Sequence, residues 1–129
     1  MKRVLFVCVH NSGRSQMAAA FARWLGEGRV EVESAGTRPA EIVNPIVVAA
    51  MREKSIDISA SVPKSSRRRD GGRADGVITM GCSLEEACPA GCVPSQDWGL
   101  DDPAGKTLGE VRAIRDRVEA KVRELLAHL

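Results

Sequence analysis

The feature that most constrains this chain is an apolar run near its start that leads into a cysteine. Residues 4–8 read Val-Leu-Phe-Val-Cys, and the polar residues 10–13 follow them. An apolar run that ends at a turn cluster is typical of a strand buried on both faces of a parallel sheet. Apolar residues then recur at positions 17, 20, 21, 24 and 25, which is helical spacing. We therefore predict a buried strand, a short loop and a helix over 16–25.

The rest of the chain alternates between strand and helix patterns. Further strands are predicted over 30–34, 74–80 and 94–98. A turn is expected at 34–37, Asn44 and Pro45 are typical of a helix start, and an apolar stripe predicts a closing helix over 108–129. This alternation favours an α/β protein with a parallel sheet covered on both faces. Its ligand site is expected at the carboxyl end of the first strand.

Composition and charge exclude several classes of protein. The length suits a single domain, which we place over 1–129, and 43% hydrophobic with 28% charged residues is ordinary for a soluble chain. The net charge of +2 and the basic run 67–69, which has no interleaved aromatic residues, do not indicate a nucleic-acid partner. The first apolar run is too short for a signal peptide or a membrane span. We therefore expect a cytoplasmic monomer with no membrane partner.

The loop after the first strand is suited to bind a tetrahedral anion. Its backbone N–H groups can surround a concavity, and the next helix adds the positive end of its dipole. Arg14 supplies a planar fork of donors that fits an oxyanion better than a lysine would. The residues expected to bind the oxyanion are Val9, His10, Asn11, Ser12, Gly13 and Arg14.

Cys8 lies at the mouth of this loop, where the positive field that holds an anion also favours a thiolate. Ser15 could donate a hydrogen bond to that sulfur, it could cap the helix, or it could do both. An inert core thiol is the alternative for Cys8, but it leaves the polar loop without a purpose. We therefore predict a nucleophilic Cys8 assisted by Arg14 and Ser15.

The stretch 8–18, Cys-Val-His-Asn-Ser-Gly-Arg-Ser-Gln-Met-Ala, resembles the low-molecular-weight phosphatase superfamily and, within it, the arsenate reductases. The resemblance covers nearly the whole chain. It implies a three-layer α/β/α fold around a four-stranded parallel sheet. His10 is a departure, because tyrosine phosphatases of this superfamily usually have glycine there, and we interpret its ring as facing solvent.

The chemistry needs a proton donor, because thiolate attack on the oxyanion must expel an oxygen. Family members carry an acidic residue directly before a proline, and this pattern maps onto Asp102 and Pro103. The resemblance therefore implies that Asp102 is the general acid, with Asp101 as a neighbour that could share the role. The alternative is a turn that caps the closing helix. Trp98 either shields this acid or fills the core.

The remaining cysteines decide which reaction follows. Thioredoxin-coupled members of the family use two further thiols after the third strand, so the resemblance implies a Cys8–Cys82 disulfide first and a Cys82–Cys88 disulfide next. Cys92 could replace either partner. The Met-Gly-Cys variant at 80–82 also resembles reductases that use a small thiol such as mycothiol. The spacing Cys-x5-Cys-x3-Cys disfavours zinc, so no metal is expected.

Three functions remain open. The first is an arsenate reductase with no tightly bound cofactor, which takes electrons from thioredoxin, mycothiol or glutaredoxin and meets phosphate or sulfate as competing anions. The second is a tyrosine phosphatase, which is disfavoured because the chain has no tyrosine and has small residues at 104–105. The third is a non-catalytic arsenic-binding protein, which gives no reason for Asp102.

Overall fold

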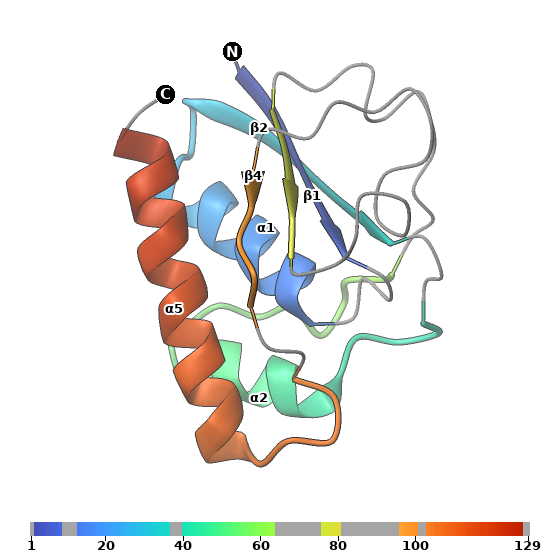
Figure 1. Cartoon of the computed structure of the whole chain (residues 1–129). Coiled ribbons are helices and arrows are strands. Elements are labelled where there is room, and N and C mark those ends of the chain that lie inside the picture. Colours follow the sequence, from blue (N-terminus) through green and yellow to red (C-terminus); the bar gives the residue numbers. More distant parts are fainter. Residues whose placement is uncertain are drawn as a thin grey trace.

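The computed structural model describes residues 2–8, 13–36, 40–63, 76–80, 96–100 and 103–127. The elements, in chain order, are β1 (Lys2–Cys8), α1 (Arg14–Leu25), β2 (Val30–Gly36), α2 (Pro45–Arg52), β3 (Gly76–Thr79), β4 (Gln96–Asp97) and α5 (Leu108–Ala127). The strands form a four-stranded parallel sheet in the order β2-β1-β3-β4 (Figure 1). The predicted fold class is confirmed, and β4 is a strand of only two residues.

The sheet is centred on β1, which pairs with β2 on one side and β3 on the other. Its last residue, Cys8, pairs with Gly36 at the carboxyl edge. The turn predicted at 34–37 is wrong in its first part, because β2 continues through Gly36 alongside β1. The ladder hydrogen bonds to β1 extend this strand beyond the alternating segment that marked it in the sequence.

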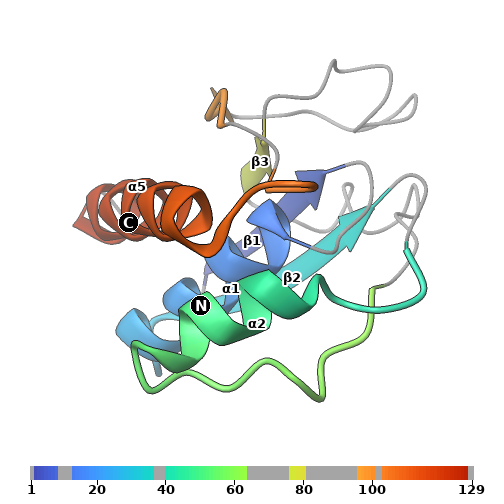
Figure 2. The same ribbon diagram turned by 90° about the horizontal axis from the view of Figure 1, so that it is seen from below.

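Both faces of β1 are buried, as the unbroken apolar run predicts. Phe6 and Cys8 face a core shared with α1, α2 and α5, which Figure 2 shows grouped on one side of the sheet. Leu5 and Val7 alternate with them, point to the opposite face and are also buried. Both faces of the central strand are therefore covered, as expected, and the three described helices lie on one of them.

The starts of the helices follow only in part from local sequence signals. The Asn44 side chain accepts a hydrogen bond from the Ile46 backbone N–H at 3.0 Å, and Pro45 takes the first helical position of α2, as predicted. Helix α1 begins at Arg14, two residues before the predicted start at 16. Between residues 108 and 127, α5 confirms the closing helix. No helix in the described segments is long and apolar enough to cross a membrane.

Candidate active site

The predicted nucleophile ends the central strand and meets the first turn of the following helix. Cys8 is 3% exposed, and its Sγ lies 2.9 Å from the Ser15 hydroxyl oxygen. Ser15 is fully buried and belongs to α1, whose N-cap is Gly13 without a side-chain cap hydrogen bond. The interpretation of Ser15 as a helix cap is therefore wrong. The Ser15 side chain contacts the Cys8 sulfur instead, and its hydroxyl can donate a hydrogen bond to that sulfur when Cys8 is ionised.

Arg14 is held among backbone carbonyls rather than exposed to solvent. Its side chain is buried, and Nη1 donates hydrogen bonds to the carbonyl oxygens of Met80 and, at 2.8 Å, of Leu100. Met80 directly follows β3, and Leu100 lies just after β4. A buried guanidinium needs such partners because its charge is costly to remove from water. Arg14 thus ties the start of α1 to the ends of two neighbouring strands.

Gly13 is in close contact with Pro103. A Cβ placed on Gly13 would lie 2.5 Å from Cγ and 3.4 Å from Cδ of the Pro103 ring, and 3.7 Å from a methyl of Val47. Pro103 is buried, and in the sequence it follows Asp102 directly. The end of the anion loop and the residue after the predicted general acid therefore touch each other.

The structure brings four of the predicted site residues together: Cys8, Gly13, Arg14 and Ser15. The other predicted site residues lie outside the described residues: Val9, His10, Asn11, Ser12, Cys82, Cys88 and Asp102. Cys92 and Asp101 also lie outside them. Within the described segments no three His, Cys, Asp or Glu side chains form a metal-binding group.

Sequence reasoning missed the partners of Arg14. A backbone carbonyl is present at nearly every position of a chain, so no residue type marks Met80 or Leu100 as partners in advance. The sequence does not indicate the Pro103 contact for a similar reason, since a proline after Asp102 carries no signal of what its ring will touch. These contacts join segments that are more than sixty residues apart in the sequence.

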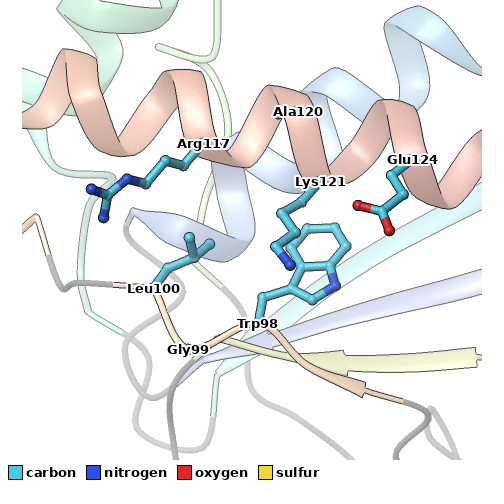
Figure 3. Close-up of a pocket in the computed structure, with 7 residues that line it drawn as sticks. All are labelled: Trp98, Gly99, Leu100, Arg117, Ala120, Lys121 and Glu124. Atoms are coloured by element: carbon cyan, nitrogen blue, oxygen red, sulfur yellow. The ribbon is translucent and has the colours of Figure 1, made fainter.

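A separate pocket of about 300 Å³ lies between α5 and the segment that follows β4 (Figure 3). Its lining consists of Trp98, Gly99, Leu100, Arg117, Ala120, Lys121 and Glu124. Trp98 is 7% exposed, and its ring centroid lies 5.6 Å from that of Phe6, so the indole fills the core as one of the two interpretations expected. The Leu100 side chain faces this pocket while its carbonyl accepts from Arg14.

Comparison with known proteins places this geometry in a family. The family model described as low molecular weight phosphotyrosine protein phosphatase matches residues 3–129. The chain belongs to this family. Among curated relatives, a putative arsenate reductase of Halobacterium salinarum is 43% identical over 93% of this chain and 87% of its own length. A glutaredoxin arsenate reductase of Synechocystis is 38% identical over 100% of this chain and 99% of its own.

Solved structures of the family agree with the fold. An arsenate reductase in the phosphate binding state superposes with a TM-score of 0.86 at 37% identity, covering 99% of this chain and 98% of that one. A thioredoxin-dependent arsenate reductase of Corynebacterium glutamicum superposes with a TM-score of 0.81 at 34% identity. This match covers 99% of this chain and 61% of the other. The resemblance stated from residues 8–18 is therefore confirmed.

Proposed function

We propose that this chain reduces arsenate to arsenite, with Cys8 as the nucleophile. The observation that carries the proposal is the contact of 2.9 Å between Cys8 Sγ and Ser15 Oγ, beside the buried Arg14. The sulfur lies at the end of a parallel strand, before the first turn of a helix, where backbone N–H groups and the helix dipole favour negative charge. The curated relatives named above are arsenate reductases, which supports arsenate as the anion.

In the first step the Cys8 thiolate attacks arsenic and displaces one arsenate oxygen. That oxygen leaves as water once Asp102 has protonated it, and a covalent bond joins Cys8 sulfur to arsenic(V). Arg14 and the loop amides of residues 9–13 hold the remaining oxygens, which carry the negative charge. The Ser15 hydroxyl holds the sulfur in place before attack.

In the second step Cys82 attacks the Cys8 sulfur. The electron pair of the sulfur–arsenic bond stays with arsenic, which leaves as arsenite, and a Cys8–Cys82 disulfide forms. Cys88 then attacks Cys82, which frees Cys8 as a thiol and leaves a Cys82–Cys88 disulfide. Thioredoxin, a dithiol protein, reduces this last disulfide. The Corynebacterium structure supports this choice of reductant, and the glutaredoxin enzyme of Synechocystis supports the main alternative.

The test is arsenate-dependent NADPH oxidation by the reduced protein with thioredoxin and thioredoxin reductase. We expect steady turnover in the wild type and none in Cys8→Ser. Cys82→Ser and Cys88→Ser should each stop multiple turnover, because each breaks the relay, while Cys92→Ser serves as the matched control and should retain it.

Three outcomes would contradict parts of the proposal. Full activity of Cys8→Ser would refute the nucleophile. Normal turnover of Cys82→Ser with mycothiol or with glutaredoxin and glutathione, but not with thioredoxin, would replace the internal relay by an external thiol. Hydrolysis of an aryl phosphate far faster than arsenate reduction would make the chain a phosphatase, the activity for which its family is named.

A further inference from the structure

We propose that Pro103 is a positioning residue for the general acid, and that position 13 lacks a side chain because the Pro103 ring occupies the space. This inference rests on the proposed role of Asp102. Gly13 ends the anion loop and Pro103 follows Asp102, so their contact joins the oxyanion site to the proton donor.

The contact leaves no room for even a methyl group. A Cβ on Gly13 would lie 2.5 Å from Pro103 Cγ, whereas carbon atoms pack at about 3.5 Å or more. A proline ring cannot rotate away as a flexible side chain can, because the ring also fixes the backbone angle φ. Pro103 is also buried, so the closely packed residues around it limit how far its ring can move away from Gly13.

A second contact holds the other end of the same short segment. The carbonyl oxygen of Leu100 accepts a hydrogen bond of 2.8 Å from Arg14, the residue that follows Gly13. Asp101 and Asp102 are bonded between Leu100 and Pro103, and a connection of that length spans about 10 Å at full extension. Leu100 and Pro103, the two residues that flank the acidic pair in the sequence, are therefore held by two consecutive residues of the site.

This double tether has a chemical consequence. A general acid works within hydrogen-bond reach of the leaving oxygen, and a misplacement of about 1 Å can cost about 100-fold in rate. A methyl group on Gly13 demands a shift of about that size, since the gap of 2.5 Å falls roughly 1 Å short of carbon packing distance. We expect this shift to move Pro103, which is bonded directly to Asp102 in the sequence.

The experiment combines Gly13→Ala, Pro103→Ala and the double variant. Alanine at 103 lacks Cγ and Cδ, the two Pro103 atoms that a Cβ on Gly13 would meet. The readout is the single-turnover rate of arsenite formation by reduced protein with no external reductant. We expect Gly13→Ala to be roughly 10- to 100-fold slow, Pro103→Ala to be only a few-fold slow, and the double variant to recover most of the loss of Gly13→Ala.

Two controls separate positioning of the acid from damage to the anion loop. The concentration of arsenate that protects Cys8 from alkylation should change by less than about twofold in Pro103→Ala, because Pro103 lies outside the proposed anion loop and only the rate should fall. Gly109→Ala, whose Cβ would have no neighbour nearer than 4.0 Å, should match the wild type in both measurements. Circular dichroism confirms that each variant is folded.

The outcomes distinguish this inference from the proposed function. A double variant as slow as Gly13→Ala, or loss of arsenate protection in Pro103→Ala, would overturn the positioning role of Pro103. Asp102→Asn with the wild-type rate would instead refute the general acid itself. Slow Asp102→Asn together with a recovered double variant supports both.

Discussion

Three consecutive residues at the start of α1, residues 13–15, each make a different contact in the site. Gly13 makes room for the Pro103 ring, Arg14 holds two backbone carbonyls, and Ser15 meets the Cys8 sulfur. Successive residues of a helix point in different directions, about 100° apart, so three neighbours can reach three separate segments. A single helix start therefore contacts the end of β1, the segments that follow β3 and β4, and Pro103.

The contact between the Ser15 hydroxyl and the Cys8 sulfur can be tested with a single substitution. In the proposed mechanism Ser15→Ala removes a hydrogen bond to the attacking thiolate, and hydrogen bonds to charged groups contribute about 1.5–3 kcal/mol. We expect alkylation of Cys8 by iodoacetamide at neutral pH, and arsenite formation in a single turnover, to slow by roughly 10- to 100-fold. Equal alkylation rates for the variant and the wild type would show that the serine does not assist the thiolate.

At the scale of elements, α2 and α5 are joined by an ion-pair cluster around Glu53, the C-cap residue of α2. The Glu53 carboxylate accepts hydrogen bonds from Arg112 at 2.6 Å and from Arg115 at 2.7 Å. Arg115 is buried and also donates to the Ala50 carbonyl oxygen at 2.9 Å. Hydrogen bonds from Arg112 and then Arg115 lower the pKa of Glu53 from 4.5 to about 2. The cluster fixes α2, whose Val47 lies near Gly13, against the closing helix.

This pKa shift predicts a pH-dependent stability. A carboxyl group whose folded pKa is depressed stabilises the fold above its unfolded pKa, and the contribution disappears as pH falls through the folded pKa. The melting temperature of Glu53→Gln should therefore lie below that of the wild type at pH 6, and the difference should shrink steadily between about pH 5 and pH 2. A difference that stays constant over this range would show that Glu53 acts through packing rather than charge.

On the scale of the whole molecule, one core joins the sheet to all three described helices. Phe6 on β1 and Trp98 after β4 are in ring contact, with centroids 5.6 Å apart and planes inclined at 54°. Trp98 also faces α5 across the pocket of Figure 3. The indole thus connects the central strand, the far edge of the sheet and the closing helix.

Trp98→Ala should consequently destabilise the fold by about 3–5 kcal/mol, as expected for removal of a large buried side chain. The chain offers a matched control, since Trp24 is 54% exposed and Trp24→Ala should cost less than about 1 kcal/mol. Urea denaturation followed by circular dichroism measures both. Similar losses for the two variants would contradict a structural role for Trp98 in the core.

Much of the fold could be predicted because its signals are local. The run 4–8 indicates a strand buried on both faces, and Asn44-Pro45 marks the start of α2, as the structure confirms. The end of β2 could not be predicted, because residues 34–36 are held as strand by pairing with β1, which lies elsewhere in the chain. The start of α1 was placed late because Arg14 and Ser15 carry polar side chains that the apolar pattern does not count, although both are buried.

The sequence by itself identified the family and predicted the nucleophile and the anion loop, because Cys8 to Ser15 form a continuous stretch whose chemistry depends on residue type and spacing. Only the tertiary structure decided that the carbonyls of Met80 and Leu100 hold Arg14, and that the Pro103 ring lies against Gly13. Backbone carbonyls and free space carry no residue-specific signal. The carbonyls become partners of Arg14, and the space beside Gly13 is filled, because the parallel sheet brings the carboxyl ends of β1, β3 and β4 to one edge.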